Sequence, residues 1–200
     1  MGTTFKTYGV GGAAGVADKL ELSANYSRLD VEGENGNVWR IGGKYQVLNQ
    51  KKNGFDLALG GSYEKASGTL IDDIFSDDLT HWNAFAAATK AFNQGSSRAA
   101  VKGTLGVRWD RFSNSYGNES KASVYAGADV PLTSTGELSL VGEVGSKIID
   151  YSGTPYAIGL RYHPKQTDFT LAAGFGKTGF LSQYVNKGGF FVQASYNFGK

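Results

Sequence analysis

Apolar and polar residues alternate along much of this chain. In residues 38–48 (VWRIGGKYQVL) one side carries Trp39, Ile41, Gly43, Tyr45 and Val47. Residues 55–64 (FDLALGGSYE) repeat the pattern, with Phe55, Leu57, Leu59, Gly61 and Tyr63 on one side. A period of two residues indicates a β-strand, because successive side chains of a strand point to opposite faces. An apolar side with aromatic residues near its ends, opposite a side that carries charges, is typical of a strand that crosses a membrane in a barrel.

The same alternation predicts ten strands. Their lengths, about nine to fourteen residues, suit tilted membrane strands, which need about 9–11 residues. Compact turns alternate with mostly longer, more polar loops, as in outer-membrane barrels, where the short turns lie at one end. We therefore expect an all-β fold, a closed antiparallel up-and-down transmembrane barrel of about ten strands, with twelve as the alternative. The predicted strands are residues 19–30, 37–48, 55–66, 80–92, 98–111, 120–132, 136–148, 155–163, 168–177 and 188–198.

The chain is expected to divide at residue 17. Residues 18–200 form the barrel. Residues 1–17, rich in glycine and alanine, form either an N-terminal arm or an extra strand of a twelve-stranded barrel. The arm is the first choice, because eleven strands would break the even number usual in bacterial barrels. Met1–Thr4 lacks the basic start and apolar core of a signal peptide, so either a leader is missing from this sequence or the chain is not exported.

Aromatic residues on the apolar side are expected to form two membrane girdles. The alternative is a soluble barrel with the apolar side inside. The many small residues of the polar side favour a narrow lumen, since a solvated outer face has little reason to use glycine, which weakens strands. The expected girdle consists of Tyr26, Trp39, Tyr45, Phe55, Tyr63, Trp82, Phe92, Trp109, Tyr156, Tyr162, Phe169, Phe175, Phe190, Tyr196 and Phe198.

Composition removes several classes of function. The formal net charge is +2, which gives no reason to expect nucleic-acid binding. The chain has no cysteine, so it has no disulfide framework and no thiolate metal site. We expect no cofactor.

Charges of both signs are predicted to face the lumen, six positive and six negative. They form either a salt-bridge network that fills the interior, which we favour, or the lining of a narrow pore. Arg108 is expected to pair with Asp129 or Glu143. The expected lumen charges are Glu21, Arg40, Lys44, Asp56, Glu64, Lys102, Arg108, Asp110, Asp129, Glu143, Lys147 and Arg161.

Catalysis and metal binding have little support in the sequence, so no catalytic and no metal residue is expected. The two histidines, His81 and His163, are predicted at opposite ends of the barrel. His81 is expected to be a polar residue of the rim, although with Asp77 or Asp78 it could imitate a hydrolase site there. The aspartates of loop 68–80 could hold Ca²⁺, but their spacing does not match an EF-hand loop. The apolar residues of this loop predict a short helical turn on the rim or a partner contact.

Residues 18–198 resemble the small outer-membrane β-barrel proteins of Gram-negative bacteria. The most specific part is Gly189–Phe198 (GFFVQASYNF), which is similar to their C-terminal assembly signal, although Gly199 and Lys200 follow its last aromatic residue. The resemblance implies an outer-membrane monomer that contacts the lipid bilayer and the assembly machinery. Its expected function is a structural or interaction role, or a narrow pore for ions and small solutes. The alternatives are a lipid- or peptide-hydrolysing rim enzyme and a soluble β-barrel ligand binder.

Overall fold

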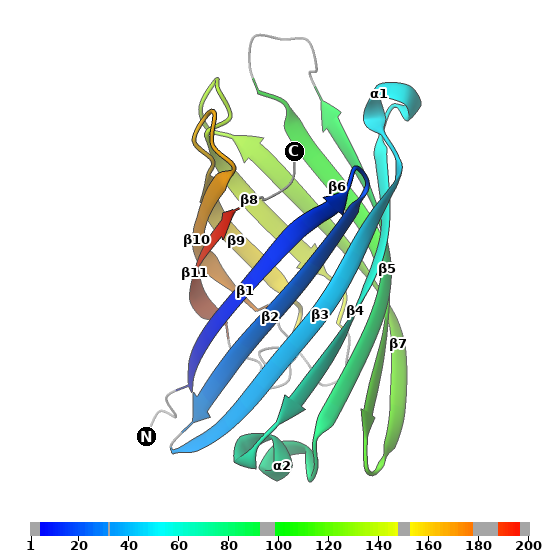
Figure 1. Cartoon of the computed structure of the whole chain (residues 1–200), viewed down its shortest axis with the longest axis vertical. Helices are drawn as coiled ribbons and strands as arrows, with labels where there is room; N and C mark the ends of the chain where they lie inside the picture. Colours follow the sequence, from blue (N-terminus) through cyan, green and yellow to red (C-terminus); the bar gives the residue numbers. More distant parts are fainter. Residues whose placement is uncertain (1–4, 32, 93–98, 148–152, 178–187, 197–200) are drawn as a thin grey trace.

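One antiparallel sheet makes up most of the part of the chain that the structure describes. The computed structural model describes residues 5–31, 33–92, 99–147, 153–177 and 188–196. Each strand pairs with the strands that precede and follow it in the sequence, so the order in the sheet is β1 to β11 (Figure 1). The strands are β1 (Phe5–Ala17), β2 (Leu20–Val31), β3 (Glu34–Leu48), β4 (Asp56–Ser67), β5 (Leu79–Phe92), β6 (Val101–Asn114), β7 (Gly117–Pro131), β8 (Leu138–Gly145), β9 (Tyr156–Tyr162), β10 (Phe169–Lys177) and β11 (Gly189–Tyr196).

The all-β antiparallel meander is confirmed, but the expected closed barrel of ten strands is wrong in two respects. Among the described residues the sheet has eleven strands, and it curls into an open half-barrel. No ladder joins β1 to β11 among the described residues. Because every pairing is antiparallel and the number of strands is odd, β1 and β11 run in the same direction. They therefore cannot complete the antiparallel pattern by pairing with each other.

The eleventh strand comes from the start of the chain. Residues 5–17, for which the sequence left an arm and a strand open, form β1, and β1 pairs with β2 from Phe5↔Val31 to Ala17↔Leu20. On one face β1 presents Gly9, Gly11 and Ala13 to β2, and a Cβ at Gly11 would overlap the side chain of Asn25. With β1 in place, the first and last strands of the sheet run in the same direction, so β1 begins and β11 ends at opposite ends of the sheet.

The two faces of the sheet differ in chemistry. The convex face exposes apolar side chains at alternate positions, including Ile41, Leu59, Leu105, Val124 and Ile158. Side chains of the opposite parity face the concave side, where neighbouring strands bury several polar ones, whereas Arg40, Lys44, Lys102 and Glu143 stay exposed. The buried polar side chains of the strands other than Lys177 lie on this concave face, namely Ser62, His81, Asn83, Asp110, Ser123 and Ser139.

In the described part of the chain, two short helices lie at opposite ends of the sheet (Figure 1). Helix α1 (Gln50–Asn53) lies in the β3–β4 connection, where Asn49 accepts a hydrogen bond from the Lys51 amide at 2.9 Å and Gly54 ends the helix with φ of 79°. Left-handed φ values favour glycine because it has no Cβ. Helix α2 (Thr69–Phe75) lies in the β4–β5 connection. No helix in the described part of the chain is long and apolar enough to span a membrane.

Helix α2 covers the loop end of the concave face. Its Leu70 and Ile71 are buried against Leu29, Ala66, Leu79 and Phe112 of strands β2, β4, β5 and β6. Ile71 lies directly over Gly36, where an added Cβ would come within 3.1 Å of the isoleucine side chain. The apolar residues predicted to form a helical turn on the rim thus belong to a small core at one end of the concave face. We call this cluster the α2 plug.

Candidate functional site

A buried aspartate organises the centre of the concave face. The carboxylate of Asp110 on β6 is fully buried, and its two oxygens have different partners. One oxygen lies 2.7 Å from Nε2 of His81 on β5, and the other accepts a hydrogen bond from Nε of Arg108 at 2.8 Å. The His81 ring stacks on Phe112 of the α2 plug, with centroids 4.4 Å apart. A buried carboxylate needs such partners, because an isolated charge is very unfavourable in a medium of low polarity.

This arrangement corrects two expectations from the sequence. Arg108 pairs with Asp110, two residues along its own strand, and not with Asp129 or Glu143. His81 is a buried member of the network and not a residue of the exposed rim. The register of β5 against β6, in which His81 lies opposite Phe112, places His81 diagonally next to Asp110. A one-residue slip would have put the two side chains on opposite faces, and alternation along one strand does not determine its register against the next.

A second network lies next to the first, around Ser62 of β4. Its hydroxyl accepts a hydrogen bond from Nε of Arg40 at 2.9 Å and another from Nδ2 of Asn83 at 2.5 Å. Arg40 lies directly opposite Glu64 in the β3–β4 ladder. Even so, no carboxylate of the described residues lies within salt-bridge distance of its guanidinium. Within the described part of the chain, Arg40 is therefore a concave-face cation that no carboxylate pairs with.

The remaining expected lumen charges have varied surroundings. Lys44 pairs with Glu21 at 3.1 Å, and Arg161 pairs with Asp129 at 2.5 Å. Asp56 accepts hydrogen bonds from the Gln50 amide and the Gln46 side chain, so it anchors helix α1. Among the described residues, no ion pair within 4.0 Å involves Glu64, Lys102, Glu143 or Lys147, and Lys147 lies beyond the end of β8.

A cavity of about 210 Å³ opens on the concave face between these networks. Its lining comes from β3, β5, β6, β7 and β8 and from the residues that follow β8. The wall combines polar and apolar side chains, with two cations and one anion among them. The lining residues that matter for its chemistry are Arg40, Asn83, Phe85, Arg108, Ser123, Tyr125 and Glu143.

Two glycines let the aromatic rings of the cavity lie flat against its wall. A Cβ at Gly60 would overlap the ring of Phe85, and a Cβ at Gly106 would overlap the ring of Tyr125. Each glycine is the cross-strand partner of the aromatic residue that covers it. Glycine within a strand often marks such a close approach. Because the two rings cover the backbone instead of projecting across the concave side, space remains between the strands.

The expected girdle residues with described side chains lie on the convex face. At the loop end, Trp39, Tyr63 and Trp82 form a continuous row, with ring centroids 5.1 and 4.5 Å apart. Phe175 joins a second group there, 6.2 Å from Tyr156 and 5.2 Å from Phe190. Tyr26 and Trp109 are exposed at the same end. The turn end carries Tyr45, Phe55, Phe92, Tyr162 and Phe169. Tyr196 pairs with Phe169 through the backbone, and Phe198 lies outside the described residues.

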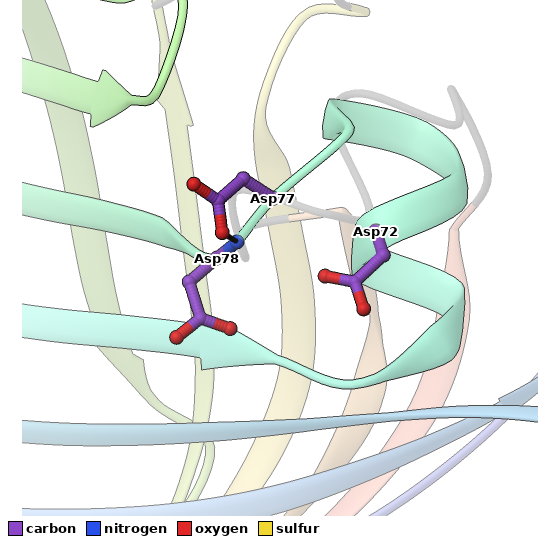
Figure 2. Close-up of side chains that lie close together, drawn as sticks. All are labelled: Asp72, Asp77 and Asp78. Atoms are coloured by element: carbon purple, nitrogen blue, oxygen red, sulfur yellow. Dashed lines mark hydrogen bonds between the residues drawn. The ribbon is translucent and has the colours of Figure 1, made fainter.

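Three aspartates approach one another beside helix α2 (Figure 2). Carboxylate oxygens of Asp72, Asp77 and Asp78 lie within 4.8 Å of one another. Asp78 also pairs with Lys65 at 2.7 Å, and Asp77 accepts a hydrogen bond from the Asp78 amide at 2.7 Å. These contacts satisfy two of the three carboxylates within the protein, and we assign no metal to the cluster.

The turn end carries a small carboxylate clamp. Glu137, just before β8, accepts hydrogen bonds from Oγ1 of Thr135 at 2.8 Å and from the Lys165 amide at 3.2 Å. The Glu137 carbonyl also accepts a hydrogen bond from the His163 amide at 2.7 Å. The hydrogen bond from Thr135, followed by that from Lys165, lowers the pKa of the Glu137 carboxyl group. The clamp joins the β7–β8 turn to the β9–β10 turn.

We expect this clamp to make stability depend on acid pH. Because the folded pKa of Glu137 lies below its unfolded value, the contribution of Glu137 is complete above the unfolded pKa, about 4.3. It is lost as pH falls through the folded pKa. Glu137→Gln should therefore show a shallower loss of stability on acidification than the wild type in urea unfolding at a series of pH values. Thr135→Val should reproduce part of the effect, and identical acid profiles for wild type and Glu137→Gln would contradict it.

In comparisons with known proteins, no family model, no curated protein and no solved structure matches this chain.

Proposed function

We propose that this chain is a barrel-type protein of the bacterial outer membrane, with lipid on its convex face and a narrow path for ions and small solutes on its concave face. The observation that carries the membrane part is the convex face. Exposed apolar side chains occupy its alternate positions, and aromatic rows border them. Soluble monomers rarely expose large contiguous apolar surfaces, and such surfaces mark membrane or protein contacts.

The cavity favours a passage for ions and small solutes over an interior that side chains fill completely. A lumen filled by its own side chains would leave no space, whereas this concave face leaves about 210 Å³ beside charged groups. The α2 plug narrows the loop end, so any conductance should be small. Charges of both signs line the face, so neither cations nor anions should be strongly preferred. A structural or interaction role of the same outer-membrane protein is the alternative.

The membrane proposal places a requirement on the two edge strands. Lipid provides no hydrogen-bond partner for the open edge of a sheet. In a bilayer the free edges of β1 and β11 must therefore be paired, either with each other in parallel or through one additional strand that runs antiparallel to both. Val10 on β1 and Phe190 and Val192 on β11 are among the most exposed apolar side chains of the described residues, and β1 and β11 approach each other without forming a ladder.

The two other functions considered from the sequence have less support. A hydrolase at the rim would need an accessible histidine, but Nε2 of His81 lies 2.7 Å from the buried Asp110 carboxylate. A soluble ligand binder would bury its apolar face, but here apolar side chains are exposed on the convex side. The C-terminal strand β11 is the proposed contact with the outer-membrane assembly machinery, and a monomer is the proposed state.

Refolding followed by single-channel recording tests the proposal. We expect the chain to require detergent, to show β-type circular dichroism and to migrate differently on gels before and after heating. In planar bilayers it should give small currents with weak ion selectivity. A folded, monodisperse monomer without detergent would exclude the membrane function. Insertion into bilayers without any current would exclude the passage of ions and leave a structural or interaction role as the function.

A further inference from the structure

We propose that the concave cavity binds a small zwitterion, a molecule with one carboxylate and one ammonium group, through Arg40 and Glu143. This inference deepens the proposed passage of small solutes by naming their chemical class. It rests on the charges around the cavity, on its size and on the position of the two aromatic rings.

The charges around the cavity leave one cation and one anion unmatched. Three charged side chains line it, namely Arg40, Arg108 and Glu143. The charge of Arg108 is matched by Asp110 at 2.8 Å. Arg40 and Glu143 do not pair with each other. Neither lies within 4.0 Å of an oppositely charged group among the described residues. They belong to β3 and β8, which are five positions apart in the sheet, and both line the cavity, so its wall carries two opposite charges from separate strands.

Each unmatched group suits one end of a zwitterion. Arg40 donates a hydrogen bond to Ser62 through Nε. Its two terminal nitrogens make no hydrogen bond with the described residues. A guanidinium binds a carboxylate in two-point geometry, and bonds to charged groups are stronger than neutral ones. The Glu143 carboxylate can accept hydrogen bonds from an ammonium group. Ionisable groups inside a membrane protein commonly mark solute and ion pathways, because they are costly there without a role.

The size of the cavity limits the ligand. Sites for drug-sized molecules have volumes of about 300–1,000 Å³, whereas this cavity has about 210 Å³. A short amino acid of a few heavy atoms is therefore the appropriate class. The rings of Phe85 and Tyr125 can contact its methylene groups, because Gly60 and Gly106 let these rings lie flat against the wall.

Ligand-observed saturation-transfer NMR on refolded protein in deuterated detergent tests the proposal. The probes are glycine, β-alanine and 4-aminobutyrate, which differ in the distance between their charges, with butyrate and butylamine as single-charge analogues. We expect at least one zwitterion to bind about tenfold more tightly than either analogue, a difference of about 1.4 kcal/mol. If none of the five probes gives saturable binding, or if butyrate binds as tightly as every zwitterion, the proposal is wrong.

Variants separate the two ends of the ligand. Arg40→Gln should weaken both the zwitterion and butyrate, whereas Glu143→Gln should weaken the zwitterion and leave butyrate unchanged. Arg40→Lys keeps the charge without the two-point geometry and should fall between wild type and Arg40→Gln. Lys44→Gln, which alters a charge of the concave face outside the cavity lining, is the matched control and should bind normally. An equal loss of zwitterion affinity in the control would show a non-specific charge effect and overturn the site.

Binding and conduction can fail separately. Zwitterion binding without current would keep the site and exclude the path. Current without zwitterion binding would keep the path and exclude this ligand class. If the chain folds without detergent, the same titration in buffer still tests the site, because the cavity is formed by the sheet itself.

Discussion

Replacing Asp110 with alanine should lower the free energy of unfolding by about 3 kcal/mol, the lower end of the range for breaking a buried ion pair. The Asp110 carboxylate has 0% exposure, and its loss leaves Arg108 and His81 without their common acceptor. The lower end applies because the Arg108 side chain keeps 28% exposure and is partly hydrated. Urea unfolding of the detergent-refolded protein, followed by tryptophan fluorescence, measures the change.

The chain offers a matched control with the same spacing. Arg28 and Asp30 on β2 also pair two residues apart, at 3.3 Å, but on an exposed surface. Exposed pairs contribute about 0–1 kcal/mol, so Asp30→Ala should have a small effect. Asp110→Asn, which keeps the volume and one acceptor oxygen, should lose less stability than Asp110→Ala. Equal losses of unfolding free energy for Asp110→Ala and Asp30→Ala would show that burial does not increase the contribution of Asp110 to stability.

Placing arginine at Val124 should destabilise the lipid-inserted protein by about 2–4 kcal/mol, the cost of a charge at the bilayer midplane. Val124 is 60% exposed on the convex face, and it lies near the middle of β7 (Gly117–Pro131). It would therefore contact the centre of the lipid layer. Unfolding in lipid vesicles, measured by urea titration, gives the change in free energy.

Tyr116→Arg is the control for this substitution. Tyr116 is also highly exposed, but it lies in the short turn between β6 and β7, at the end of the sheet. Its replacement should cost about 0–1 kcal/mol, as for arginine near an interface. If arginine is tolerated equally at positions 116 and 124 in vesicles, the convex face does not contact lipid and the proposed membrane function is wrong.

Alternation in the sequence was enough to predict most strands and their faces. Residues 37–48 and 168–177, for example, were predicted as strands, and the structure has β3 at Glu34–Leu48 and β10 at Phe169–Lys177. The signal is strong there because large apolar side chains alternate with polar or small ones. Strand β1 was harder to recognise, because small residues occupy both of its faces between Gly9 and Gly15. With little contrast between the faces, the period of two residues is weak.

The number of strands and the network of Asp110 with His81 and Arg108 depend on features that a single strand does not encode. One extra strand at the start of the chain changes ten strands to eleven, and the two edge strands then run in the same direction. The contact between His81 and Asp110 depends on the register of β5 against β6, which fixes the diagonal neighbours. In the sequence these residues are 29 positions apart. The charges expected in the lumen could be named from alternation, but their partners could not.

The strictly sequential order of the strands also has a consequence for folding. Every ladder joins neighbours in the sequence, so no pairing has to wait for a distant part of the chain. Closing short loops costs less conformational entropy than closing long ones, and proteins rich in local contacts fold faster. The sheet can therefore grow one hairpin at a time, with each finished edge serving as the template for the next strand. Deleting an outer strand would remove one ladder, whereas deleting a central strand would divide the sheet into two separate growing units.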